Sequence, residues 1–232
     1  MDNREILISY AIKYEGNYNL INKAIINKEK VDYLKYDNCL TIFDDNYPKE
    51  FLYLRNPPLV LFYKGNIDLL KEDKIAIIGT RNPCEYSSLA TKALALNINK
   101  VVVSGLAKGI DGIAHNYSAR SIGILGCGID YIYPKENYDL YKKLESTGLI
   151  LSEYYGKALP LAYNFPFRNR LIAALAKEIY VMEAHEKSGT LTTINEALDL
   201  GKEIKVLPFD VFNKQGIYNN FLIEEGASII KL

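Results

Sequence analysis

From Lys74 onward, short apolar runs alternate with longer stretches of helical spacing, and this alternation constrains the fold more than any other feature. Strands are expected at residues 75–78, 101–104, 122–125, 149–152, 179–182, 204–207 and 228–230. Helices are expected between them, at roughly residues 86–98, 110–120, 137–146, 168–177, 190–200 and 217–225. Strands that are apolar on both faces and separated by helices form a parallel sheet with helices on each side. The sequence therefore predicts a doubly wound α/β fold with a mostly parallel sheet.

The first 72 residues follow a different pattern. Apolar residues recur at helical spacing over residues 6–14 and again over 20–25, on either side of Gly16-Asn17. A short helix is expected after Pro48, and a short strand at residues 59–63. We therefore predict two regions, a small and mainly helical N-terminal cap over residues 1–72 and an α/β domain over residues 73–232.

Length and composition exclude several classes of protein. With 232 residues, of which 49% are hydrophobic, the chain is long enough to bury a core and unlike a disordered protein. Its apolar runs are too short to span a bilayer, and the N-terminus lacks a signal-peptide pattern, so no membrane partner is expected. Three widely spaced cysteines without a CxxC pair indicate reduced thiols in the cytoplasm. Two histidines leave little material for a metal site or a Ser-His-Asp triad.

The charges are balanced overall but unevenly distributed. The formal net charge is +0, which argues against a strongly basic nucleic-acid binder. Two windows, residues 86–110 and 154–177, nevertheless contain no acidic residue and together hold seven lysines and arginines. Arginine grips phosphate at two points and stacks on bases, which lysine does not do equally. Of six arginines in the chain, Arg81, Arg168 and Arg170 lie just after or between predicted strands.

Four segments that follow or lie between predicted strands carry glycines, hydroxyls or arginines. In a parallel α/β sheet the carboxyl ends of the strands lie along one edge, where ligands bind. We therefore expect these segments to converge on one crevice of glycine backbone, hydroxyl groups and positive charge, which suits phosphates. The candidate residues are Gly79, Thr80 and Arg81 in the first segment; Ser104, Gly105, Lys108 and Gly109 in the second; Phe165, Arg168, Asn169 and Arg170 in the third; and Ser188, Gly189 and Thr190 in the fourth.

Each segment also has a simpler structural interpretation. Gly79 is equally consistent with a tight strand-to-helix turn, Phe165 and Phe167 with core packing, and Ser188 with helix capping. Asp111 and His115, four residues apart, are interpreted as a helix N-terminal acid and a surface pair, and a role in orienting the loop is the alternative. The first segment lacks the GxGxxG fingerprint, and the second lacks GxxxxGK[ST], so neither an ordinary NAD site nor a P-loop is predicted.

The segment 165–170 is the strongest binding candidate. Pro166 is expected to keep Phe165 extended, with helix beginning near Arg168. A positive helix end disfavours arginine, so two arginines there are more easily explained if an anion joins them. Aromatic rings nearby offer faces on which unpaired bases could stack. Tyr131, Tyr133 and Pro134, which follow another predicted strand, are expected to wall the crevice or fill the core.

Taken together, the motifs resemble those of the DNA-processing protein A family, also called Smf, over roughly residues 47–230. The resemblance is carried by GTR at 79–81, SGLAKGID at 104–111, His115, GCGIDYIYP at 126–134, SEY at 152–154, FPFRNR at 165–170, EA at 183–184, SGTLTT at 188–193 and LIEEGA at 222–227. Phe209, after Pro208, departs from the glycine that is common in the family.

The resemblance implies an extended Rossmann-like core that binds single-stranded DNA at these loops and helps to load a RecA-type recombinase during natural transformation. By motif match, Arg81, Lys108, Phe165, Arg168 and Arg170 take the DNA-binding role. The pocket lining would come from Gly105, Ser188, Gly189 and Thr190. Members usually form dimers, and residues 204–232 are the natural place for a homodimer contact.

The predicted function is therefore a non-enzymatic binder of single-stranded DNA that protects the strand, mediates recombination and needs no cofactor. A nucleotide-cleaving phosphoribohydrolase is the alternative, because such enzymes use a GGxGTxxE segment. Here Ser188 replaces the first glycine, and Glu196 falls later than that pattern requires. A sensor that binds a nucleotide without cleaving it is a third hypothesis.

Overall fold

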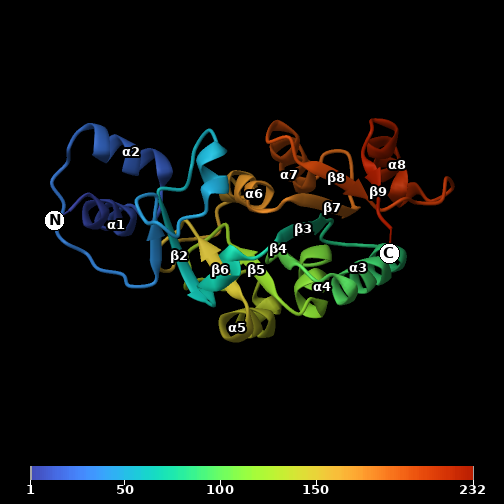
Figure 1. Cartoon of the computed structure of the whole chain (residues 1–232), viewed down its shortest axis with the longest axis horizontal. Helices are drawn as coiled ribbons and strands as arrows, with labels where there is room; N and C mark the ends of the chain where they lie inside the picture. The colour runs from blue at the N-terminus through green and yellow to red at the C-terminus, as the bar shows by residue number, and fades with distance from the viewer. Residues whose placement is uncertain (1, 232) are drawn as a thin grey trace.

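The computed structural model describes residues 2–231, and within this range the strands form one nine-stranded sheet (Figure 1). Met1 and Leu232, the outer bounds of the two predicted regions, lie outside the described residues. The strand order is β1-β2-β6-β5-β4-β3-β7-β8-β9. The strands are β1 Cys39–Thr41, β2 Val60–Gly65, β3 Lys74–Gly79, β4 Val101–Gly105, β5 Ser121–Ile124, β6 Leu149–Ser152, β7 Glu178–Glu183, β8 Glu203–Val206 and β9 Ser228–Ile229.

Helices connect most of these strands, as the alternation predicts. The α-helices are α1 Asn3–Lys13, α2 Tyr18–Ile26, α3 Glu85–Asn97, α4 Ile110–Tyr117, α5 Tyr138–Thr147, α6 Asn164–Leu175, α7 Gly189–Asp199 and α8 Ile217–Glu224. Four short 3₁₀ helices are η1 Lys49–Tyr53, η2 Ile67–Lys71, η3 Lys135–Asn137 and η4 Lys214–Gly216. The predicted doubly wound α/β fold is confirmed.

The order of the parallel strands places a crevice beside β3. From β3 the chain winds outward through β4, β5 and β6, then returns to β7 on the other side of β3. Loops that leave neighbouring strands in opposite directions open a gap at the carboxyl edge of the sheet. The structure thus separates the loops after β3 and β7 at the position where the sequence predicts a binding site.

Alternate side chains of the central strand, β3, pack against the two helical layers. Figure 1 shows α3, α4 and α5 on one face of the sheet and α6, α7 and α8 on the other. Ile75 and Ile77 belong to the core that contains the buried residues of α3 and α4. Ala76 and Ile78 belong to the core that contains those of α6 and α7. Each isoleucine buried in this way contributes roughly 1.5–3 kcal/mol, so the apolar strand is a consequence of burial on two sides.

The N-terminal region adds two strands to this sheet. β2 pairs antiparallel with β6, and β1 pairs antiparallel with β2. Buried residues of α1 and α2 pack in one core with Phe62 of β2 and Ile150 of β6. β1 was not predicted, because three residues are too few to show an alternating pattern. The sheet continues across residue 72, and the division into two regions stays a prediction.

Helix α6 starts earlier than predicted. It begins at Asn164 rather than near Arg168, so Phe165 is helical and the expectation of an extended Phe165 is wrong. Pro166 is the third residue of the helix, where a backbone N–H has no partner within the helix. Proline therefore costs no hydrogen bond there, and its fixed φ suits the first turn.

Asp111 and His115 are buried, which corrects their interpretation as a surface pair. The His115 Nε2 lies 2.7 Å from the carbonyl oxygen of Gly105. Since a carbonyl only accepts, Nε2 carries the proton and Nδ1 is the bare nitrogen, which has no partner within residues 2–231. Burial lowers the pKa of His115 from 6.5 to about 4. The imidazole is therefore neutral in the folded protein at neutral pH.

Protonation of His115 is expected to destabilise the fold as the pH falls from 6.5 toward 4. The unfolded chain binds this proton near pH 6.5 and the folded chain only near pH 4, so acid favours the unfolded state. The free energy of unfolding should drop by up to about 3 kcal/mol across this window. His115→Gln does not titrate and should flatten the profile between pH 6.5 and 4.5, measured by urea unfolding. Equal slopes in the two proteins would contradict this.

Candidate functional site

Two adjoining cavities lie at the carboxyl ends of the central strands. Their volumes are about 290 and 310 Å³. Both are lined by Arg81, Ala107, Phe165 and Arg168, so they form two halves of one crevice. The predicted residues that line this crevice are Gly79, Thr80, Arg81, Lys108, Phe165, Arg168, Asn169, Ser188, Gly189 and Thr190. The structure therefore brings together parts of all four predicted segments.

Arg81 is the exposed cation of the crevice. Its side chain makes neither a hydrogen bond nor an ion pair within the described part of the chain. Its guanidinium carbon lies 5.8 Å from the centre of the Phe165 ring. Lys108, at the rim of the second cavity, differs because its Nζ lies 2.6 Å from Glu136 Oε1. Both partners of that pair are exposed, so the ion pair is weak and exchangeable.

Arg168 is a buried cation beneath the crevice. Its guanidinium donates to the carbonyl oxygen of Ile124, and its Nε donates to Asn169 Oδ1 at 3.1 Å. Burial lowers the pKa of Arg168, while the charge of Asp111 opposes that shift. Burial likewise raises the pKa of Asp111, and Arg168 opposes it. These hydrogen bonds and the nearby charge of Asp111 offset the cost of burying the guanidinium, and Nη2 makes no hydrogen bond within residues 2–231.

Arg170 does not line the crevice, which removes the geometric basis for its predicted phosphate contact. Its Nη1 and Nη2 each lie 2.7 Å from an oxygen of Glu153, and both side chains are 5% exposed. Nε donates to the carbonyl oxygen of Asn56 at 3.0 Å. The centre of the Phe167 ring lies 3.7 Å from the guanidinium carbon of Arg170, so the ring stacks against the guanidinium. Arg170 therefore fastens α6 to the end of β6 and to the segment before β2.

Ser104 and Gly105 lie under the crevice and do not face it. Ser104 is fully buried, and its hydroxyl donates to the carbonyl oxygen of Ile77 at 2.6 Å. A Cβ on Gly105 would lie 2.6 Å from Asp111 Oδ2 and 2.8 Å from Arg168 Nη2. These predicted residues are therefore structural supports, and Gly105 is required because the buried pair occupies the space of a side chain.

Gly109 brings two of the loops into contact. Its φ of +76° is unfavourable for residues with a side chain, and a Cβ would lie 2.4 Å from the Thr80 carbonyl oxygen. The next residue, Ile110, donates its N–H to that same oxygen at 3.1 Å. Gly109 thus does not line the crevice but lets the loop after β4 pack against the loop after β3.

The N-terminus of α7 forms the opposite wall. Ser188 occupies the N-cap position, yet its side chain makes no capping hydrogen bond, and its Oγ has no partner within residues 2–231. Gly189 follows, with no atom within 4 Å of the position a Cβ would take. The first N–H groups of a helix lack intrahelical partners and carry partial positive charge. Together with the free hydroxyl, they provide donors for an anion.

Phe165 supplies the aromatic surface of the crevice. Its ring centre lies 5.6 Å from that of Tyr133, which lines the second cavity with Pro134. Arg81 and Arg168 lie at 5.8 and 6.0 Å from the same ring. Sequence reasoning left Tyr133 open between the crevice wall and the core, and missed Asn82 and Ala107, which also line it. No residue-type signal distinguished these two from ordinary loop positions.

The described residues contain neither a cluster of metal ligands nor a helix that could span a membrane. Within 2–231, no three histidine, cysteine, aspartate or glutamate side chains are grouped so that they could hold a metal ion. The helices in this range are too short or too polar to cross a bilayer. The arrangement instead combines anion donors, an exposed guanidinium and a ring, which suits a phosphate chain with attached bases.

Comparisons with known proteins agree on one family. The family model described as DNA recombination-mediator protein A matches residues 38–232. The DNA processing protein DprA of Streptococcus pneumoniae is 35% identical over 219 residues, which cover 92% of this chain and 76% of the relative. Its Bacillus subtilis counterpart is 38% identical over 201 residues, which cover 83% and 68% respectively.

Solved structures give the same result. The crystal structure of S. pneumoniae DprA superimposes with a TM-score of 0.80 at 30% identity and covers 98% of this chain and 90% of that one. A structure that addresses the single-stranded DNA binding mode of Helicobacter pylori DNA processing protein A gives 0.77 at 35% identity and covers 85% and 93%. The resemblance predicted from the motifs is confirmed, and the chain belongs to the DNA recombination-mediator protein A family.

Proposed function

We propose that this protein binds single-stranded DNA in the two-part crevice and acts as a recombination mediator in natural transformation. The observation that carries the proposal is the position of Arg81, an exposed guanidinium without an internal partner, beside the Phe165 ring and opposite the free donors of α7. The single-stranded DNA binding of the H. pylori relative supports it.

Binding in the crevice depends on two interactions, phosphate contacts with positive groups and stacking of bases on aromatic rings. Phosphates bind to Arg81, to Ser188 Oγ and to the first N–H groups of α7, while Arg168 supplies buried positive charge beneath them. Bases stack on Phe165 and Tyr133, with roughly 1–3 kcal/mol for each stacked base. None of these contacts selects one base over another, so affinity depends on salt and little on sequence.

The nucleotide-cleaving alternative is disfavoured. The family match is to recombination mediators. Glu196, the carboxylate that a hydrolase would use, does not line either cavity, and burial raises its pKa. Asp111, which does line the first cavity, lies against Arg168. The crevice is therefore interpreted as a binding site without a catalytic carboxylate.

We further propose a homodimer that forms through the C-terminal segment. Between β8 and the end of β9 several apolar side chains are exposed, and Val211 and Phe212 are 81% and 89% exposed. Ile217, Phe221 and Ile229 in the same segment are exposed as well, and these five residues are called the apolar patch. Exposed apolar side chains that gather in one segment are typical of an interface, and a two-fold axis lets such a segment contact its copy. The RecA-type recombinase and action in the cytoplasm remain part of the proposal.

Arg81→Ala is expected to weaken binding to oligo-dT about tenfold, because it removes a charge-assisted phosphate contact. The loss should be similar for other sequences, and the salt dependence should decrease by about one phosphate contact. Fluorescence anisotropy at two salt concentrations measures both quantities. Arg55→Ala is the matched control, because Arg55 is exposed and lines neither cavity. Equal affinities of the two variants would contradict the site.

Arg170→Ala is expected to act on stability instead. The substitution leaves Glu153 buried without its partner, which costs about 3–5 kcal/mol of unfolding free energy. Arg81→Ala should leave that free energy within about 0.5 kcal/mol of the original, as exposed substitutions do. Urea unfolding of both variants compares them. A stable Arg170→Ala protein with weakened DNA binding would instead restore Arg170 as a direct contact.

Phe212→Glu combined with Phe221→Glu should convert the dimer into a monomer, because two charges would be buried in each copy of the interface. Light scattering at tens of micromolar measures the change. Tyr53→Glu serves as the control, since Tyr53 is 80% exposed and lies in η1, outside the apolar patch. An unsubstituted protein that is monomeric at this concentration would contradict the proposed dimer.

A further inference from the structure

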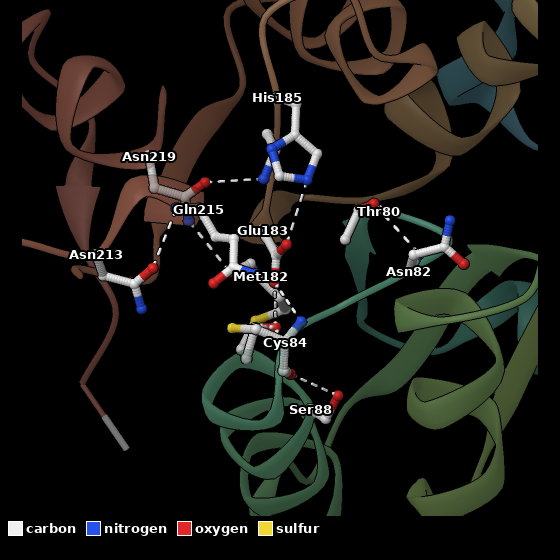
Figure 2. A network of polar contacts seen from close by, with 12 residues as sticks. Thr80, Asn82, Cys84, Ser88, Met182, Glu183, His185, Asn213, Gln215 and Asn219 are labelled. Atoms are coloured by element: carbon white, nitrogen blue, oxygen red, sulfur yellow. Dashed lines mark hydrogen bonds and ion pairs between the residues drawn. The ribbon is translucent and has the colours of Figure 1, made fainter. Parts of the chain in front are cut away.

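The loop that carries Arg81 is anchored at both ends by one residue. This loop, residues 80–84, runs from the end of β3 to the start of α3 (Figure 2). At its first residue, Thr80 N–H donates to the backbone oxygen of Glu183 at 2.8 Å. At its last residue, Cys84 N–H donates to Glu183 Oε2 at 2.9 Å. Glu183, the last residue of β7, therefore holds the two ends of the segment that presents Arg81.

The Glu183 side chain is buried and fully occupied. Only 1% of the residue is exposed. Besides Cys84 N–H, its Oε2 accepts from the hydroxyl of Ser87, and its Oε1 lies 3.2 Å from Nε2 of His185. The carboxylate thus satisfies a donor at the N-terminus of α3, where backbone N–H groups lack partners and the helix dipole favours negative charge. Figure 2 shows the contacts of Glu183 with Cys84 and His185.

A bulge in β7 directs this carboxylate toward α3. Ile78 is opposite Val181, but Gly79 is opposite Glu183, so β7 has one extra residue at this point. Met182 packs in the core with α3, and Glu183 also contacts α3, so successive side chains face the same side. Such a bulge re-aims a side chain beside a functional site. Buried Asn219 holds it, donating to the Met182 carbonyl oxygen and accepting from Ala184 N–H.

Arg81 depends on this anchoring because it has no anchor of its own. Its side chain makes no polar contact within residues 2–231, so the loop backbone decides where the guanidinium lies. Within residues 2–231 the loop backbone is also held by Ile110 N–H, which donates to Thr80 O, and by Ser88 N–H of α3, which donates to Cys84 O. We infer that Glu183 is a positioning residue for single-stranded DNA binding, which acts through Arg81. This inference rests on the proposed function.

The sign of the effect distinguishes positioning from simple electrostatics. Glu183 is an acid in a protein proposed to bind a polyanion. If charge alone mattered, replacing it with a neutral residue would tighten binding, because less negative potential would oppose the phosphates. If Glu183 positions Arg81, the same replacement weakens binding, since a glutamine cannot accept from both Cys84 N–H and Ser87 O–H with the same strength. The two explanations therefore predict opposite changes in affinity.

The test is a double-mutant cycle with Glu183→Gln and Arg81→Ala, measured by anisotropy with labelled oligo-dT at two salt concentrations. Glu183→Gln is expected to weaken binding roughly five- to tenfold and to lower the salt dependence by about one phosphate contact. In the Arg81→Ala background it should cause no further loss, because coupled residues are not additive. Additive losses, unchanged affinity or tighter binding would each overturn the inference.

Two further measurements keep the result decisive. Ser87→Ala removes one donor to the same carboxylate oxygen and leaves the Cys84 hydrogen bond in place. It should weaken DNA binding roughly two- to threefold. In the Arg81→Ala background it should cause no further loss of affinity. If Glu183→Gln does not fold, this variant alone decides the inference. If Arg81→Ala binds as tightly as the original protein, the proposed crevice is wrong. If Arg81→Ala binds weakly and Glu183→Gln does not, only the positioning role is wrong.

Discussion

The position of β3 at the point where the chain reverses its winding direction determines the rest of the structure. Because β4 and β7 lie on either side of β3, and the helices after β3 and β7 cover opposite faces of the sheet, the loops that follow β3 and β7 diverge and leave space between them. The N-terminus of α6 closes that space from one face of the sheet. A crevice of this kind needs no dedicated domain, since it results from the order in which buried apolar strands are added to one sheet.

Within this frame, positive charge is used in two ways. Arg168 and Arg170 are buried; Arg170 is paired with Glu153, and Arg168 donates to the Ile124 carbonyl oxygen and to Asn169, so both stabilise the walls and the floor of the site. Arg81 and Lys108 are exposed at the crevice, where a ligand reaches them. The family motif at 165–170 thus combines a ring that faces the crevice with an arginine that supports it from behind. Proximity in sequence does not give neighbouring arginines the same role.

Much of the fold and part of the site could be predicted from the sequence, for identifiable reasons. Strands buried on both faces produce apolar runs that any reader can find, and parallel strands place their carboxyl ends together. The partner of Arg170 could not be found, because Glu153 is seventeen residues away with no periodic relation to it. The helical state of Phe165 was missed because a proline two or three residues into a helix is tolerated. The family could be predicted from the resemblance of the motifs. That Arg170 is buried and paired while Arg81 lines the crevice became visible only in the structure.

The two exposed cations of the crevice start from different states. Lys108 already has a carboxylate neighbour in Glu136 and must exchange it for a phosphate, a swap of one ion pair for another. The Arg81 guanidinium has no internal bond to break. In the proposed binding mode, Arg81 therefore takes a phosphate without first giving up an ion pair, whereas Lys108 gives up Glu136. The two cations of the crevice thus differ in the bond that each must exchange to hold the same ligand.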